Sequence, residues 1–406
     1  MSVHHLAILG GEPAFSETLH VGRPNIGDRK KLMERLESLL DRNWLTNNGP
    51  LVREFEKRLS EKLQVKHVIA VCNATVGLEI ATRAAGLSGE VIVPAFTFIA
   101  TAHALQWQEI TPVFCDVDPL THNLDPAKVE QLITPRTTGI LGVHLWGRPC
   151  DIEALQEIAD RHSLKLMFDA AHAMGSHHQG RPIGGFGLAE IFSFHATKVM
   201  NAFEGGAIAT NDVELARKVR LMNNFGFTGL DTVEYIGMNG KMNEASAAMG
   251  LTSLESLDEF VRANSKNHSA YASGINAIPG LNLASYQPEH RAAQQYVVIE
   301  VDERTAGISR DNLLMTLHAE NIRARRYFFP GCHRMEPYRS AKNTAYDLPV
   351  TESLCKRVLC LPTGMAVNGE VIDRICGVLA SAISHADEIN EKLSENQEFY
   401  QLVAQP

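Results

Sequence analysis

Short apolar runs alternate with helical segments from residue 67 to about residue 210, and this alternation restricts the fold to few classes. Apolar runs bounded by turn residues are typical of buried strands, and the segments between them have helical spacing. Strands of this kind, linked by helices, form parallel sheets that are covered on both faces. The expected strands are 67–71, 89–94, 112–116, 139–144, 164–169, 191–194 and 207–210. We therefore predict an α/β fold with a large, doubly wound, mostly parallel sheet.

Composition limits the classes of function. The chain has 406 residues, of which 45% are hydrophobic and 21% are charged, which is typical of a globular protein with a large core. Its net charge of -9 argues against a nucleic-acid-binding protein, which would carry a basic excess. No signal peptide and no apolar run of membrane-spanning length is visible, so we expect no membrane association. The seven cysteines form no CxxC pair, which predicts a cytoplasmic protein with reduced thiols and no metal site.

The pattern divides the chain into three parts. Residues 1–30 are rich in glycine and proline and are expected to form an irregular N-terminal arm, which either crosses to a partner subunit or is a loose terminus. Residues 31–259 are expected to form the large domain. The alternation weakens beyond about residue 250, so residues 260–406 are expected to form a smaller α+β domain. The other expected elements are helices at 30–40, 52–59, 98–107, 151–162, 253–273, 310–319 and 371–393 and a strand at 295–301.

Polar residues follow the ends of several expected strands. In open α/β sheets, ligands bind beyond the carboxyl ends of the strands, so these residues should share one face. They are Asn73 to Thr75, Phe96 to Phe98, His144, Asp169 to His172 and Lys198. The sequence therefore predicts a binding site at this edge of the sheet.

Lys198 lies between two apolar strands with few acidic residues nearby. Removal from water disfavours the ammonium form, and a neutral lysine amine can form a Schiff base with a carbonyl. The alternative is a lysine at a strand end whose charge reaches solvent. The rest of the site decides between these interpretations.

A lysine enzyme that uses pyridoxal 5′-phosphate needs a phosphate cup, a carboxylate for the pyridine nitrogen and a platform for the ring. Asn73 to Thr75 precede a helix, where backbone N–H groups can bind a phosphate. Asp169 can pair with the pyridinium nitrogen, and Phe98 can stack on the ring. Each residue also has an ordinary structural interpretation, as a helix cap or as part of the core. The joint occurrence of all of them favours the cofactor site.

The sequence resembles the DegT/DnrJ/EryC1/StrS family, the nucleotide-sugar aminotransferases of fold type I that use pyridoxal phosphate. The block SFHATK followed by EGG, with DAAHA upstream, is highly specific. The matching segments are LTNNGPLVREFE (45–56), NATVGLEIA (73–81), VIVPAFTFIATAHAL (91–105), FDAAHAMGS (168–176), FSFHATKVMNAFEGGAIAT (192–210) and GMNGKMNEASAAMGL (237–251). This resemblance implies the fold of type I pyridoxal-phosphate transferases.

The resemblance also implies roles for individual residues. Lys198 would form the Schiff base, Asp169 would hold the pyridine nitrogen, and His172 would lie near the ring hydroxyl. Phe98 would stack on the ring. The phosphate contacts would be Ala74, Thr75 and Ser193, and Asn239 would reach the phosphate in the neighbouring subunit, which implies a homodimer with shared active sites.

Substrate contacts are expected in the basic segment 322–327, because a diphosphate requires cations. Arg326, Tyr327, His333 and Tyr338 resemble the variable substrate loop of the family. The alternative for this segment is a solvated run of charges.

The implied reaction moves an amino group from an amino acid, expected to be L-glutamate, to a keto-sugar carried on a nucleoside diphosphate. The motifs are nearest to enzymes that aminate C4 of dTDP-4-keto-6-deoxyglucose, and amination at C3 of a 3-keto isomer is the alternative. Two further classes stay open: a non-catalytic sensor that binds cofactor and sugar, and a lysine aldolase without a cofactor. The presence of Lys198 disfavours the dehydratase relatives, which have histidine at this position.

Overall fold

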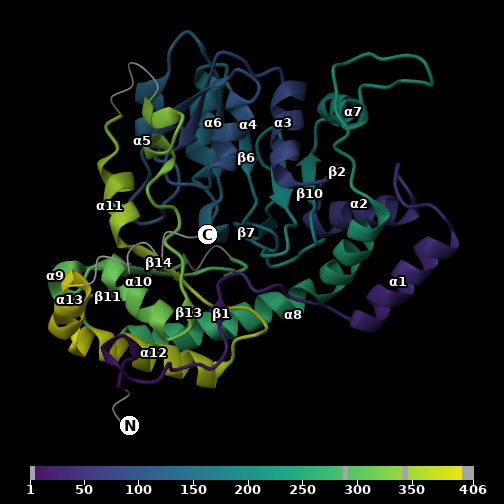
Figure 1. The fold of residues 1–406 in the computed structure, drawn as a ribbon. Coiled ribbons are helices and arrows are strands. Elements are labelled where there is room, and N and C mark those ends of the chain that lie inside the picture. The colour runs from purple at the N-terminus through teal and green to yellow at the C-terminus, as the bar shows by residue number, and fades with distance from the viewer. Residues whose placement is uncertain (1–4, 287–290, 341–345, 396–406) are drawn as a thin grey trace.

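The computed structural model describes residues 5–286, 291–340 and 346–395 and has two lobes joined by one long helix (Figure 1). The larger lobe contains a seven-stranded sheet with the order β2-β10-β9-β6-β5-β3-β4. Its strands are β2 (His67–Val71), β3 (Glu90–Pro94), β4 (Thr111–Cys115), β5 (Thr137–Val143), β6 (Lys165–Asp169), β9 (Glu190–Ser193) and β10 (Gly206–Thr210). β10 runs in the opposite direction to the other six strands of this sheet, which are parallel to one another. The predicted mostly parallel α/β sheet is confirmed.

Alternate residues of the strands face two different cores, as the two-residue period of a strand requires. On β2, Val68 and Ala70 pack in the core that contains α2, α6 and the long helix α8 (Glu244–Ile275), whereas Ile69 and Val71 pack with α3, α4 and α7. Helices therefore cover both faces of the sheet. The helices of this lobe are α1 (Arg29–Asp41), α2 (Pro50–Leu63), α3 (Ala74–Ala84), α4 (Ala100–Gln106), α5 (Pro126–Val129), α6 (Ile152–Arg161) and α7 (Val213–Met222), and β7 (His177–His178) pairs with β8 (Arg181–Pro182).

The smaller lobe surrounds an antiparallel three-stranded sheet with the order β11-β12-β14. Its elements are β11 (Leu281–Leu283), β12 (Val297–Val301), α9 (Glu303–Ala306), α10 (Arg310–Ala319), α11 (Pro349–Arg357), β14 (Val358–Leu361), α12 (Gly369–Ser384) and α13 (Ala386–Glu395). The N-terminal segment packs here: Leu6, Ile8 and Phe15 are buried in the core of this lobe, and β1 (Leu19–His20) pairs with β13 (Ile322–Arg323). The described part of the arm is thus packed on its own subunit.

The long helix α8 (Glu244–Ile275) belongs to both lobes. It begins nine residues before the predicted helix, because the Asn243 side chain caps it by accepting the N–H of Ser246 at 2.8 Å. Leu257 and Phe260 pack in the core of the large lobe, whereas Tyr271 packs in the core of the small lobe. The predicted domain boundary at residues 259 and 260 falls inside this helix, and it stays a prediction.

The predicted terminal helix 371–393 is wrong in one respect, because it consists of two helices. The first, α12, ends at Ser384, and α13 begins at Ala386. His385 separates them with a non-helical backbone (φ −112°, ψ 26°). This break turns Ile389 and Leu393 into the same core that α12 covers.

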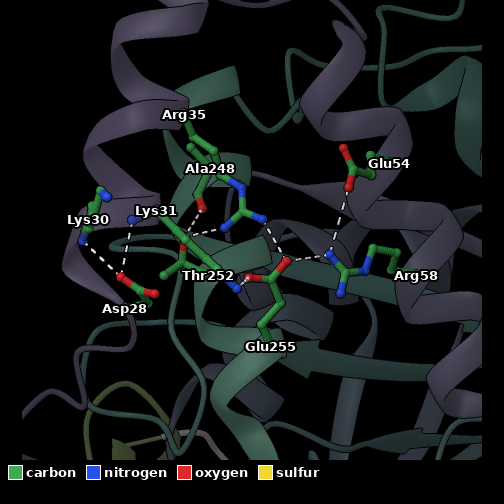
Figure 2. A network of polar contacts seen from close by, with 9 residues as sticks. All are labelled: Asp28, Lys30, Lys31, Arg35, Glu54, Arg58, Ala248, Thr252 and Glu255. Carbon is green, nitrogen blue, oxygen red and sulfur yellow. Dashed lines mark hydrogen bonds and ion pairs between the residues drawn. The ribbon is translucent and has the colours of Figure 1, made fainter.

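A network of ion pairs joins α1, α2 and α8 around Glu255 (Figure 2). The Glu255 carboxylate accepts hydrogen bonds from Arg35 and Arg58, each at 2.6 Å, and Lys31 lies 3.5 Å away. Arg35 also donates to the Thr252 hydroxyl at 2.7 Å. These arginines lower the pKa of Glu255 from 4.5 to about 2, against the opposing effect of burial. The network therefore fixes the first two helices on the helix that connects the lobes.

We expect Glu255→Gln to lower the free energy of unfolding by about 1–2 kcal/mol at pH 7, which allows for the partial exposure of this group. Because the folded-state pKa is depressed, the stabilisation is complete above the unfolded pKa and is lost as the pH falls from about 5 towards 2. In thermal unfolding experiments, the Tm of Glu255→Gln should therefore lie further below that of the wild type at pH 7 than at pH 4. Glu61→Gln is the control, because its exposed pair with Lys57 is 4.0 Å long. A difference that does not depend on pH would contradict this assignment.

Candidate active site

A cavity of about 580 Å³ lies beyond the carboxyl ends of the sheet strands, between the two lobes. The large lobe supplies most of its wall, and Tyr296, Tyr327 and Phe328 of the small lobe close it. Eight of the twelve residues predicted for the site line this cavity: Ala74, Thr75, Phe98, Asp169, His172, Ser193, Lys198 and Tyr327. Strand order explains this convergence, since β2, β6 and β9 all end at the cavity.

The turn before α3 and the end of β9 form one cup. The Asn73 side chain accepts the N–H of Val76 at 2.9 Å, and the N–H groups of Ala74 and Thr75 begin the helix, where no intrahelical acceptor exists. Gly206 of β10 lies opposite Ser193 in the sheet, and a Cβ at Gly206 would come within 2.8 Å of the Ala74 nitrogen. Because Gly206 has no side chain, the N-terminus of α3 and Ser193 can lie side by side.

Lys198 lies on the loop between β9 and β10, and its side chain borders the cavity. Its Nζ is 3.2 Å from the hydroxyl of Tyr296. Burial lowers the pKa of Lys198 from 10.5 to about 8, although the charge of Asp169 opposes this shift. A substantial fraction of the amine is therefore neutral near physiological pH and available as a nucleophile or base.

The N-terminal segment supports the lysine loop from behind. Gly22 has φ +75°, and a Cβ there would lie 2.9 Å from the Thr197 side chain. The Asn25 side chain donates to the Val199 carbonyl at 3.1 Å, and Asn201 donates to the Asn25 carbonyl at 2.8 Å. The two residues that flank Lys198 are thus held by contacts with the arm.

Asp169, the last residue of β6, is buried at the base of the cavity. Its Oδ1 accepts the N–H of Ala171 at 3.0 Å, and its Oδ2 accepts the hydroxyl of Thr101 at 2.8 Å. Burial raises the pKa of Asp169, and these two hydrogen bonds and the charge of Lys198 oppose this effect. The carboxylate is therefore oriented by two hydrogen-bond donors, and a further cation would stabilise its charged form.

His172 lies three residues after Asp169 and is also buried. Burial, with the charge of Lys198, holds its pKa well below 6.5, so the ring is neutral at neutral pH. The backbone N–H of Trp146 points at Nδ1 over 3.4 Å, which places the ring proton on Nε2. Trp146 reaches this position with a left-handed backbone (φ 60°), which is uncommon for a residue other than glycine. His172 can therefore donate a hydrogen bond from Nε2.

These residues fit pyridoxal phosphate. The cup offers free backbone N–H groups and a hydroxyl to a phosphate, which the start of a helix favours. A buried carboxylate suits a protonated ring nitrogen, and a partly neutral lysine suits covalent attachment. Phe98 is 58% exposed although it lines the cavity, so its ring face is free to stack on a ligand.

Four predicted residues lie outside the cavity. Arg326 pairs with Asp311 at 3.1 Å and stacks on Phe329, and His333 is buried beside Glu352, 3.5 Å away. Tyr338 packs on Phe114 in the core of the large lobe. Asn239 is exposed on the loop that follows α7. Arg326, His333 and Tyr338 thus have local partners in this chain, and their contact with substrate stays a prediction.

Three residues that hydrogen-bond to predicted site residues were not expected from the sequence: Thr101, Trp146 and Tyr296. Thr101 could have been found, because it lies on the helix after β3, four residues beyond Thr97 and on the same face. Trp146 and Tyr296 carry no comparable signal, since their places depend on a strained turn and on the packing of the small lobe.

The described residues contain no metal site of a common type. No group of three or more His, Cys, Asp or Glu among them could hold a metal ion. No helix in this part of the chain has the length and apolar character needed to cross a membrane.

Comparison with known proteins gives consistent results. The dTDP-4-amino-4,6-dideoxy-D-glucose transaminase of Escherichia coli is 35% identical over 367 residues, which cover 89% of this chain and 98% of that protein. The GDP-perosamine synthase of Caulobacter vibrioides is 36% identical over 84% of this chain and 92% of that protein. The solved structure of DesI with its TDP-sugar product matches with a TM-score of 0.93 and 49% identity, over 97% of this chain and 100% of that one.

These relatives identify the protein as a nucleotide-sugar aminotransferase that uses pyridoxal phosphate. The family model of the DegT/DnrJ/EryC1/StrS aminotransferases matches residues 27–380, which include every residue of the cavity. The chain therefore belongs to the DegT/DnrJ/EryC1/StrS aminotransferase family.

Proposed function

We propose that the protein transfers the amino group of L-glutamate to C4 of dTDP-4-keto-6-deoxyglucose. The observation that carries the chemistry is the arrangement of Lys198 and Asp169 in one cavity at the ends of the strands. The similarity to a transaminase named for a 4-amino-4,6-dideoxyglucose product supports C4 as the position of amination. The name of that transaminase also supports dTDP as the carrier.

Lys198 acts as the acid and base of both half-reactions. A pKa of about 8 lets Nζ take a proton from Cα of the amino donor in the first half-reaction and give a proton to C4 of the sugar in the second, near neutral pH. Bound pyridoxal phosphate supplies the electron sink for this proton transfer. Asp169 would hold the ring nitrogen in its protonated form, and His172 would donate a hydrogen bond from Nε2 to the ring oxygen.

A homodimer with shared sites completes the active site. No arginine is among the described residues that line the cavity, although the substrate carries a diphosphate. The loop after α7 bears Asn239 and exposes large apolar side chains: Phe225, Phe227, Leu230, Val233 and Ile236. Exposed apolar groups of this kind mark contact surfaces. We infer that this loop enters the site of the partner subunit and brings Asn239 to the cofactor phosphate.

A reducing compartment, the cytoplasm, is also part of the proposal. All seven cysteines are free, and six of them are buried. Burial raises the thiol pKa of Cys332 and Cys355 to about 12, so these thiols are unreactive. The fold thus gains nothing from an oxidising environment.

The direct test is the absorbance spectrum of the purified protein with bound cofactor, followed by L-glutamate and then dTDP-4-keto-6-deoxyglucose. We expect glutamate to bleach the visible band, and the keto-sugar to restore it and to yield a 4-amino product by NMR. The 3-keto isomer is the control substrate and should not restore the band. Bleaching that only the 3-keto isomer reverses would refute C4 amination, and the absence of bleaching would refute glutamate as the donor.

Asp169→Asn should separate catalysis from folding. Loss of the carboxylate should slow the reaction with glutamate about 100-fold or more, since the ring nitrogen loses its anionic partner. Burial raises the pKa of Asp169, so its charged form costs stability in the protein without cofactor. The Tm of the cofactor-free variant at pH 8 should consequently equal or exceed that of the wild type. A rate within a few-fold of wild type would exclude the proposed role.

Shared sites predict complementation between two inactive variants. In Lys198→Ala the lysine is lost, and in Asn239→Ala the contact from the neighbouring subunit is lost. Random pairing of the two chains at equal amounts gives half mixed dimers, each with one intact site, so we expect about a quarter of wild-type activity after co-expression. Activity no higher than that of either variant alone would place both residues in the same subunit's site.

A further inference from the structure

Tyr296 contacts the reacting amine of Lys198, although it is not among the site residues that the family resemblance implies. It precedes β12 of the small lobe, and its hydroxyl lies 3.2 Å from Nζ of Lys198. The same Nζ lies 5.9 Å from the centre of the tyrosine ring. The amine thus meets the polar edge of the ring, and the small lobe contributes directly to the surroundings of the lysine.

The position of Tyr296 is fixed from several sides. Its ring lies 4.6 Å from the ring of His172 and packs edge-on against Trp146 at 5.3 Å. Its carbonyl accepts the Tyr286 hydroxyl at 3.1 Å, and the neighbouring Gln295 donates to the Thr197 carbonyl at 3.4 Å. Two adjacent residues of the small lobe therefore bond to two adjacent residues of the lysine loop.

A phenol hydroxyl is suited to a lysine that changes its protonation state. It accepts a hydrogen bond from an ammonium group and can turn to donate one to a neutral amine. Burial raises the pKa of Tyr296 well above 10, so the hydroxyl stays protonated and does not itself act as the base. A lysine side chain is otherwise flexible along four methylene groups, and small displacements of a reacting group cost much rate.

We propose that Tyr296 is a positioning residue that holds Nζ of Lys198 in place in both of its protonation states. The effect on turnover rests on the proposed function, since Lys198 must be released and must carry a proton in each half-reaction. The contact itself exists in the protein without substrate. It follows that the small lobe takes part in catalysis through this side chain.

The hydroxyl also affects the pH dependence of the amine. A hydrogen bond accepted from an ammonium is stronger than one donated to a neutral amine, so Tyr296 favours the charged lysine. Loss of the hydroxyl should therefore lower the pKa of Lys198. The other titratable groups that line the cavity with this lysine are Asp169 at the end of β6, His172 after it, Tyr327 of the small lobe, and His195 and Glu204 on either side of Lys198 in the lysine loop.

The test compares Tyr296→Phe with Tyr271→Phe, which removes a buried hydroxyl that donates to the Pro362 carbonyl in the core of the small lobe. Cofactor-free protein is mixed with pyridoxal phosphate across a pH series, trapped with borohydride, and the labelling of Lys198 is measured by mass spectrometry. We expect a wild-type midpoint near 8, a midpoint lower by about half a unit in Tyr296→Phe, and no change in Tyr271→Phe. The rate of bleaching by glutamate should fall about tenfold in Tyr296→Phe, with the half-saturating glutamate concentration unchanged.

Each outcome decides the proposal. The proposal would be overturned if Tyr296→Phe had the same labelling midpoint and the same rate of bleaching as the wild type. It would also be overturned if the variant lost only thermal stability or cofactor affinity. A shift of equal size in Tyr271→Phe would show a general effect of small-lobe packing and would also overturn it. If glutamate fails to bleach the wild-type protein, the proposed donor fails, while the labelling midpoints still decide whether Tyr296 holds the lysine.

Discussion

The burial of two opposite charges, Lys198 and Asp169, is the constraint on which the active site depends. Each group loses hydration in the cavity, so the pKa of the lysine falls to about 8 and that of the carboxyl group rises. Their attraction offsets part of this cost, but further hydrogen bonds are also needed to keep the pair in a dry site. Ala171 and Thr101 donate to the carboxylate, and the Tyr296 hydroxyl accepts from the lysine. A ligand with a cationic ring nitrogen and a carbonyl carbon satisfies both groups, which explains why the site suits pyridoxal phosphate.

The sheet explains how residues distant in sequence reach this pair. Asp169 ends β6, Ser193 ends β9, and the turn before α3 follows β2, so parallel strands deliver three functional groups to one edge. The antiparallel strand β10 then lies between β2 and β9, and the missing side chain of Gly206 allows the close approach of the cup. The geometry of the phosphate cup is thus a consequence of strand order and of one glycine, Gly206.

The sequence was sufficient to predict the sheet, the lysine and the groups at the strand ends, because each depends on a local pattern of an apolar strand followed by a polar residue. It could not decide the role of Arg326, because a basic segment looks the same whether it binds a phosphate or pairs with a neighbour such as Asp311. The contact of Tyr296 could not be predicted, because the residue before β12 meets Lys198 only through the packing of one lobe on the other. The break at His385 was missed for a similar reason, since helical spacing continues through it.

Because the active site depends on the second lobe, the two lobes must be held in a fixed arrangement. Two sets of contacts do this. The helix α8 runs without interruption from one core to the other, and the ion pairs of Glu255 hold α1 and α2 on its first half. At the other side of the cavity, Gln295 and Tyr296 bond to the lysine loop, and the N-terminal segment bonds to the same loop through Asn25. The loop that carries Lys198 therefore contacts the sheet, the small lobe and the arm. A change in any of these three supports is transmitted to the amine, so neither lobe alone can provide a complete active site.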